Sequence, residues 1–143
     1  MAINLLRIQQ EQVILQKYFA NRFAFVGLNT TKPYVDIGLQ SNSKAVYRIR
    51  VELPEDYPNS LPKVFMTLPK PLKNRNGRDM TEVSHSMHTL SPSNGDVQIC
   101  HYKVENWTPN VTIYKIALKV RIWIEAYEGH VRTGKDIDDF LKS

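Results

Sequence analysis

The sequence predicts an α+β fold in which helices pack on one face of an antiparallel β-sheet. Three observations predict it: apolar residues recur at helical spacing near both ends of the chain, four segments between them have strand-like patterns, and the links between those segments are short. Short links favour antiparallel neighbours, because a parallel pair needs a crossover of about a dozen residues or more. With 143 residues, the chain is expected to form a single domain, residues 1–143, around one core.

The first helix is predicted over residues 2–20. Its apolar residues lie roughly along one face, with Gln9, Gln10, Glu11 and Gln16 between them. The apolar residues of this predicted face are Ile3, Leu6, Val13, Ile14 and Tyr18. Asn21 is a suitable residue to end the helix.

A four-stranded antiparallel meander is predicted next, over residues 23–28, 34–40, 46–54 and 63–69. The third strand, "VYRIRVELP", has the clearest pattern, because apolar residues alternate with charged ones. Such a period of two indicates one buried face and one wet face. Between the third and fourth strands, the prolines of "PEDYPNSLPK" exclude a helix and make a stiff connection.

Residues 69–106 show no clear periodicity and are predicted to form a long irregular segment. Structureless stretches of this length are uncommon inside a compact domain and often carry function. The first half of the segment is basic, which fits either a solvated lobe or a docking surface. Its basic residues are Lys70, Lys73, Arg75 and Arg78.

A long helix follows, with Thr108 as its predicted cap and Pro109 in its first turn. Its core-facing stripe has the spacing of three and four that an amphipathic helix requires. The stripe consists of Ile113, Ile116, Ala117, Val120, Trp123 and Ile124. Gly129 is the predicted end. A short final helix is predicted through Ile137, Phe140 and Leu141.

The composition indicates a protein of a reducing compartment, and we expect a cytoplasmic location. The chain has one cysteine, so it forms no internal disulfide. Its first residues lack the continuous apolar stretch of a signal peptide, and no segment approaches the length of a membrane helix. The net charge of +5 suits an acidic partner, but the basic residues lack the interleaved aromatics of a nucleic-acid platform. We therefore expect neither nucleic acid nor membrane as a partner.

Cys100, within "VQICHY", is open to two interpretations. A lone cysteine is usually a small buried apolar residue, and Val97 and Ile99 indicate local packing. Its place late in the irregular segment favours a nucleophile instead. Polar residues nearby, namely His101, Asn94 and His88, are candidates to donate to an oxyanion.

A cysteine–histidine peptidase also needs an imidazole beside the sulfur. His101 is a poor base for Cys100, because neighbouring side chains of an extended segment point to opposite faces. His130 lies beyond the long helix, and nothing in the sequence indicates that it reaches back. One cysteine with scattered histidines lacks the paired ligand spacing of a zinc site, and no glycine-rich phosphate loop is present. We expect no metal and no bound cofactor.

Three stretches, in order over about residues 47–124, resemble the ubiquitin-conjugating enzymes. "YRIRVELPEDYPNSLPKVFMT" is similar to the family's third strand, its Tyr-Pro turn and its fourth strand. "NGDVQIC" resembles the glycine, short strand and Ile-Cys that present the active-site thiol. "WTPNVTIYKIALKVRIWI" resembles the Trp-Ser-Pro motif and the helix that crosses the sheet after it. The resemblance implies a fold with an N-terminal helix, a four-stranded meander, a long active-site loop, a crossing helix and a short C-terminal helix.

The resemblance implies that Cys100 forms a thioester. It would receive a C-terminal glycine carboxyl from an activating enzyme and pass it to an amine, usually of lysine, without a cofactor. The chain departs from the family upstream, where His88-Thr89-Leu90 stands in place of His-Pro-Asn. His88 is then the counterpart of the motif's histidine and Asn94 a possible substitute for its asparagine. Glu128 or Asp136 is the candidate acidic group near the acceptor lysine.

Minimal members with a poor His-Pro-Asn motif are similar to bacterial proteins of antiphage operons with cyclic-oligonucleotide signalling (CBASS). The resemblance implies a partner that offers its C-terminus, either a cGAS-like nucleotidyltransferase or a ubiquitin-like protein, with or without an activating enzyme. Two alternatives stay open at this stage. One is a non-catalytic binding module of the same fold, and the other is an unrelated cysteine hydrolase.

Overall fold

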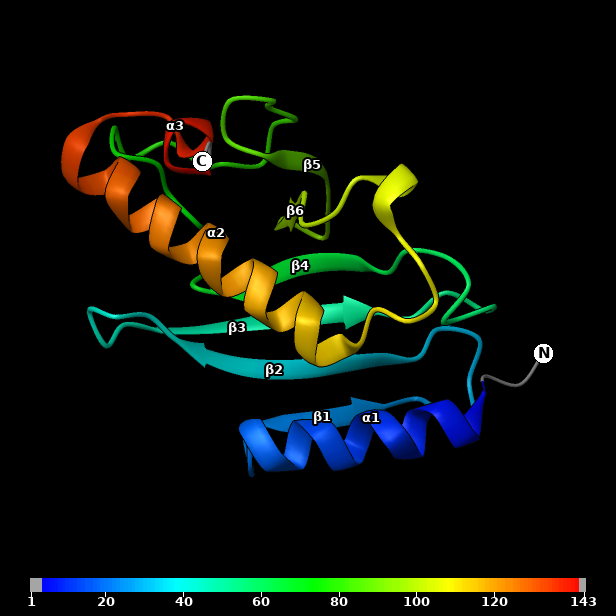
Figure 1. Cartoon of the computed structure of the whole chain (residues 1–143). Coiled ribbons are helices and arrows are strands. Elements are labelled where there is room, and N and C mark those ends of the chain that lie inside the picture. Colours follow the sequence, from blue (N-terminus) through cyan, green and yellow to red (C-terminus); the bar gives the residue numbers. More distant parts are fainter. Residues whose placement is uncertain (1–3, 142–143) are drawn as a thin grey trace.

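The computed structural model describes residues 4–141, which form a mixed α+β structure (Figure 1). In chain order its elements are α1 (Leu5–Tyr18), β1 (Phe23–Val26), β2 (Tyr34–Gln40), β3 (Val46–Glu52), β4 (Lys63–Leu68), β5 (Thr89–Ser93), β6 (Asp96–Ile99), the 3-10 turn η1 (Val104–Asn106), α2 (Ile113–Thr133) and α3 (Ile137–Leu141). The strands form one antiparallel sheet in the order β1-β2-β3-β4-β6-β5. The predicted α+β class, the N-terminal helix and the short final helix are confirmed.

The predicted number of four strands is wrong, because the segment expected to be irregular contributes β5 and β6. These two strands form a hairpin whose turn is Asn94-Gly95. Both turn residues have left-handed backbones, with φ of 54° and 77°. Asn-Gly is the pair that most favours a tight hairpin turn, since both residues tolerate positive φ. β6 then pairs with β4 and extends the sheet to six strands.

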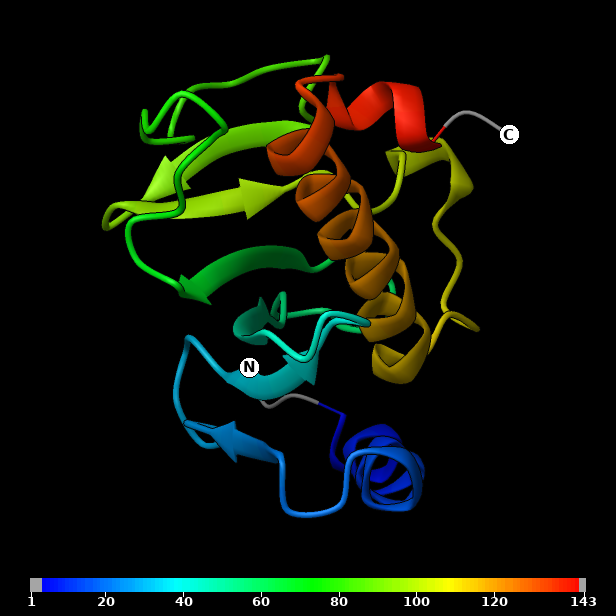
Figure 2. The same cartoon turned by 90° about the vertical axis from the view of Figure 1, so that its left-hand side faces the viewer.

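The helices α1 and α2 lie on the same side of the sheet (Figure 2). α2 crosses the sheet, while α3 lies at the β5–β6 end, opposite the end that α1 occupies (Figure 1). The alternation of β2 and β3 sends Val35, Ile37, Ile49 and Val51 into the core against α2, and all four are fully buried. None of the helices described between residues 4 and 141 is long and apolar enough to cross a membrane.

The predicted buried face of α1 is wrong. The helix buries Ile8, Glu11 and Leu15, whereas Leu6 and Val13 are about 70% exposed (69% and 72%). The reason is Glu11, whose carboxylate accepts hydrogen bonds from three donors and therefore faces the interior. Ile8 and Leu15, which lie three and four residues from Glu11, share its face of the helix and are buried with it. The predicted helix start at Ala2 and the core residue Ile3 lie outside the described residues.

Both predicted ends of the long helix are wrong as well. α2 begins four residues later than Thr108 would place it, because Thr112 is the N-cap and accepts a hydrogen bond from the Lys115 N–H at 3.1 Å. It continues through Gly129 and ends before Gly134, which has the left-handed φ of 83°. Gly129 instead provides room for a side chain of α3, since a Cβ there would lie 2.8 Å from the Phe140 ring.

Candidate functional site

The site is built around Cys100, the residue that directly follows β6. Its N–H donates to the His88 carbonyl at 2.9 Å, which continues the pairing of β5 with β6 by one residue. The cysteine is half-buried rather than sealed in the core. Burial raises the pKa of its thiol, and the nearby Lys103 ammonium opposes this increase. The free protein therefore holds Cys100 mainly as a thiol at neutral pH.

Cys100 lines a pocket of about 620 Å³ whose exposed lining is mostly apolar. Four parts of the chain contribute: the turn before β5 with the start of that strand, the segment after β6, one face of α2 and the end of α3. The lining residues that the chemistry concerns are His85, His88, Cys100, His101, Lys103 and Lys119. A hollow of this kind has room for a peptide segment beside the sulfur.

His88 comes from the turn before β5 and has a left-handed backbone with φ of 53°. Its Nε2 lies 2.7 Å from Oδ1 of Asp138 in α3, and both side chains keep about a quarter of their surface exposed (26% and 22%). The Asp138 N–H also donates to the Ser86 carbonyl at 2.8 Å. The structure thus brings His88 and Cys100 into one pocket and supports the imidazole with a carboxylate.

His101 lines the same pocket, but its ring is largely enclosed. Its Nδ1 lies 3.4 Å from the Ile99 carbonyl, and its Nε2 is buried with no hydrogen-bond partner among the described residues. Burial lowers the pKa of His101 to about 4, against which the Ile99 carbonyl acts weakly. The ring is therefore neutral at physiological pH.

Asn94 is not brought to Cys100. It is exposed in the hairpin turn at the opposite end of β6, where its carbonyl accepts a hydrogen bond from Lys70 Nζ at 2.6 Å. Its left-handed backbone gives it a structural role in the turn. The sequence contains the signal for this role, since Asn94 precedes Gly95 between two strand-forming runs.

Glu128 also lies away from the pocket, on α2. Its carboxylate accepts hydrogen bonds from the hydroxyls of Tyr47, at 2.7 Å, and Ser43, at 2.9 Å. Burial tends to raise the pKa of Glu128, but these hydroxyls and Ser41 outweigh it and lower the pKa. Glu128 fastens α2 to the β2–β3 turn region. The other acidic candidate, Asp136, is exposed in the turn before α3 and does not line the pocket.

His130 has two hydrogen bonds at the end of α2. Its Nδ1 donates to the Lys135 carbonyl at 2.8 Å, and its Nε2 accepts from the Arg75 N–H at 3.1 Å. It does not line the Cys100 pocket. Sequence reasoning missed Asp138, which supports His88 from a position 50 residues away. No local signal marks such a pair, because only the packing of α3 brings it together.

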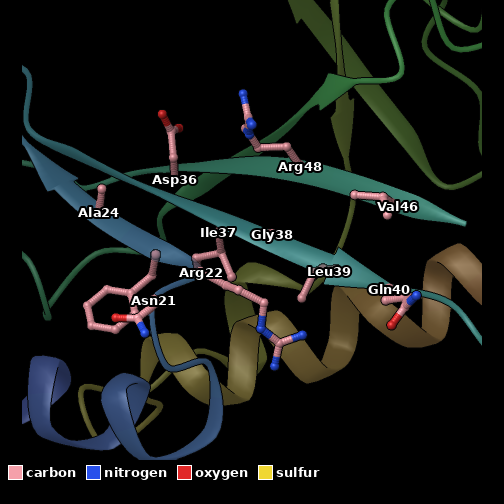
Figure 3. Close-up of a pocket in the computed structure, with 11 residues that line it drawn as sticks. Asn21, Arg22, Ala24, Asp36, Ile37, Gly38, Leu39, Gln40, Val46 and Arg48 are labelled. Carbon is pink, nitrogen blue, oxygen red and sulfur yellow. The ribbon is translucent and has the colours of Figure 1, made fainter. Parts of the chain in front are cut away.

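A second pocket, of about 560 Å³, lies along β1, β2 and β3 beside the α1–β1 connection (Figure 3). It contains no cysteine or histidine. Its two arginines, Arg22 and Arg48, point away from each other (Figure 3). Polar groups that converge on one point mark a binding site more strongly than volume does. The Cys100 pocket is therefore the candidate site.

Comparisons with known protein families, with curated proteins and with solved structures find no match to this chain. Among residues 4–141, no group of three or more His, Cys, Asp or Glu side chains is arranged to hold a metal ion. The likeness to ubiquitin-conjugating enzymes stays a prediction from the motifs.

Proposed function

We propose that the chain is a ubiquitin-conjugating-enzyme-like acyl carrier. In this proposal Cys100 forms a thioester with the C-terminal carboxyl of another protein and transfers that acyl group to an amine. The observation that carries the proposal is that Cys100 is half-buried and lines a large, mostly apolar pocket. A sulfur enclosed in the core would instead be a packing residue.

The pocket suits a thioester better than a free, permanently activated thiolate. Burial raises the pKa of Cys100, so the resting thiol is weakly nucleophilic and little prone to oxidation. An activated acyl donor supplies the driving force that such a thiol lacks. Once the thioester forms, the apolar walls limit access of water, and the Lys103 charge favours the oxyanion and the leaving thiolate.

The partners in this proposal follow from the resemblance described above. The transferred protein is a cGAS-like nucleotidyltransferase or a ubiquitin-like protein, joined through its C-terminus, in bacterial antiphage defence in the cytoplasm. An activating enzyme supplies the acyl group where the partner does not arrive activated. The mostly apolar lining is compatible with an extended C-terminal tail laid beside the sulfur.

A cysteine hydrolase is the second candidate, because one observation favours it. His88 lines the pocket with Cys100 and is supported by Asp138, as in enzymes whose nucleophile is activated by a histidine and a carboxylate. The two functions differ in what attacks the acyl group. A carrier holds its thioester until an amine arrives, whereas a hydrolase releases the acyl group to water at once.

The test is to incubate the protein with the products of neighbouring genes and to follow adducts on non-reducing gels and by intact mass. We expect a thiol-sensitive adduct that is absent from Cys100→Ala and becomes resistant to hydroxylamine at neutral pH in Cys100→Ser. An adduct that persists in water and disappears when lysine is added supports the carrier. Cleavage of a partner without an adduct supports the hydrolase, and the absence of both reactions contradicts both functions.

A further inference from the structure

We propose that His88 is the general base of the aminolysis step and that Asp138 is the residue that positions it. This inference rests on the proposed function, since it concerns the discharge of a thioester on Cys100. The observation behind it is the contact of 2.7 Å between His88 Nε2 and Asp138 Oδ1 at the wall of the Cys100 pocket.

The hydrogen bond to Asp138 determines which nitrogen of His88 can act. A carboxylate accepts, so His88 Nε2 carries the proton and donates it to Asp138. Nδ1 of the neutral ring then has the free lone pair. This is the arrangement in which a carboxylate holds the tautomer and stabilises the imidazolium once the other nitrogen has taken a proton.

The β5–β6 hairpin places His88 close to Cys100. Thr89 pairs with Ile99, and the next residues outward, His88 and Cys100, are joined by the bond of 2.9 Å from the Cys100 N–H to the His88 carbonyl. Both residues line the same hollow. An amine that attacks an acyl group on the sulfur therefore arrives beside the His88 ring.

The other titratable side chains of the pocket suit this role less well. These are His85, His101, Tyr102, Lys103 and Lys119. His85 is exposed and lies against the His88 ring at a centroid distance of 5.9 Å. His101 directs Nδ1 to a carbonyl and has Nε2 buried, which leaves neither nitrogen open to an incoming amine.

Asp138 is held in place by the packing of α3. Ile137 is fully buried, the Asp138 N–H donates to the Ser86 carbonyl at 2.8 Å, and the Phe140 ring covers Gly129 of α2. The carboxylate is thus fixed by the fold and reaches His88 without moving.

In the aminolysis step the neutral amine nitrogen attacks the thioester carbonyl and loses one proton to His88 Nδ1, while Asp138 stabilises the imidazolium. The tetrahedral intermediate collapses with formation of the C–N bond and cleavage of the C–S bond, and Cys100 leaves as thiolate. The thiolate takes the proton back from His88, so the products are an amide and the original thiol.

The experiment uses the full chain and a defined acyl donor. A synthetic peptide α-thioester that ends in glycine acylates Cys100, and excess donor is removed. Discharge to free lysine, and exchange with the small thiol mercaptoethanesulfonate, are followed by intact mass at one mildly alkaline pH. We expect His88→Asn, a residue that tolerates the left-handed backbone, to slow discharge about 100-fold. We expect Asp138→Asn to slow it about 10-fold or more by favouring the wrong tautomer.

The choice of attacking group separates chemistry from structure. A thiolate needs no base, so exchange of the thioester with mercaptoethanesulfonate should match the wild type in both variants, while discharge to lysine slows and Asp138→Glu restores part of the lysine rate. Asp139→Asn, an exposed neighbour on α3, is the matched control and should leave both rates unchanged. Thermal unfolding of each variant shows whether it is folded.

The outcomes are distinguishable. Slower discharge to lysine with unchanged thiol exchange in folded variants supports the inference. If Asp138→Asn and His88→Asn match the wild type, or slow discharge to lysine and exchange with the thiol alike, the inference is wrong and the acyl carrier stands. If the donor forms no thioester on wild-type Cys100, the proposed function and the inference both fail.

Discussion

Two carboxylates, Glu11 and Asp138, each fasten a terminal helix to the rest of the molecule, but in opposite surroundings. Glu11 of α1 is fully buried and accepts hydrogen bonds from Arg7 Nε at 2.9 Å, the Tyr57 hydroxyl and the Ile113 N–H at 3.0 Å. Asp138 of α3 is about a fifth exposed (22%) and supports a histidine at a pocket that also contains a thiol. One carboxylate is enclosed by donors, and the other keeps part of its surface exposed to solvent.

The difference teaches how to separate a structural carboxylate from a chemical one. Glu11 joins α1, the Tyr57 turn and the N-terminus of α2, and its hydrogen bonds leave no room for a substrate. Asp138 is paired with the ring of His88, a residue that lines the same pocket as Cys100. Burial and saturation indicate structure, whereas partial exposure beside a nucleophile indicates chemistry.

Replacement of Glu11 tests its structural role and has the largest expected effect on stability. Glu11→Ala leaves the buried Tyr57 hydroxyl and the Ile113 N–H without their acceptor and removes the ion-pair partner of Arg7, so we expect a loss of about 3 to 5 kcal/mol in the free energy of unfolding. Urea denaturation measures it. Gln9→Ala, an exposed site on the same helix, is the control and should change stability by less than about 0.5 kcal/mol. A loss below 1 kcal/mol at Glu11 would contradict a structural role.

His101 lines the pocket, yet its buried ring is expected to affect stability and not the reaction. Burial lowers its pKa from 6.5 to about 4, so the unfolded chain binds the proton more tightly than the folded chain does. Stability that is present above pH 6.5 is then lost as pH falls towards 4, by up to about 3 kcal/mol.

The measurement is urea unfolding at pH 7, 5.5 and 4.5 for the wild type and His101→Gln. We expect the variant to lose less stability on acidification, and the difference between the two proteins isolates His101 from the carboxylates that titrate in the same range. Parallel losses in both proteins would show that His101 is not held neutral by the fold.

Gly129 packs against α3, the helix that carries Asp138, so a substitution there should affect both stability and the proposed reaction. Gly129→Ala places a methyl group against the Phe140 ring, and such overpacking costs about 1 to 3 kcal/mol. Because Asp138 lies on the displaced helix, the discharge of a Cys100 thioester to lysine should slow as well. The double variant Gly129→Ala with Phe140→Ala removes the clash and should recover part of the stability. Full activity in a destabilised Gly129→Ala would separate α3 from the chemistry.

How much the sequence predicts depends on the range of the interactions. The alternation in β3 is local, so its buried and exposed faces were predicted, and the thiol after β6 was placed by a short motif. The β5–β6 hairpin has a local signal in Asn94-Gly95, yet the prolines and polar residues around it favoured an irregular segment. The buried face of α1 was mispredicted because a charged residue, Glu11, is its centre.

The supporting pair of the site lies beyond the reach of sequence patterns. His88 and Asp138 come into contact because α2 continues past Gly129 to Thr133 and α3 then packs against α2. Gly129, which the sequence pattern marks as a helix end, is instead a packing site for Phe140. A contact across 50 residues leaves no periodicity to detect. The position of Cys100 directly after a short strand was therefore predictable, whereas the contact between His88 and Asp138 was not.

The smallest expected effect concerns Lys103, which opposes the burial that raises the pKa of Cys100. Lys103→Met removes the opposing charge, so the pKa should rise further and less thiolate should be present at pH 7.5. We expect alkylation by iodoacetamide to slow about 2- to 3-fold, as a charge at a partly exposed site allows. Lys115→Met, an exposed site on α2 outside the pocket, should leave the rate unchanged. An equal or faster rate in Lys103→Met would mean that desolvation alone controls the thiol, and that positive charge at this wall does not stabilise the leaving thiolate.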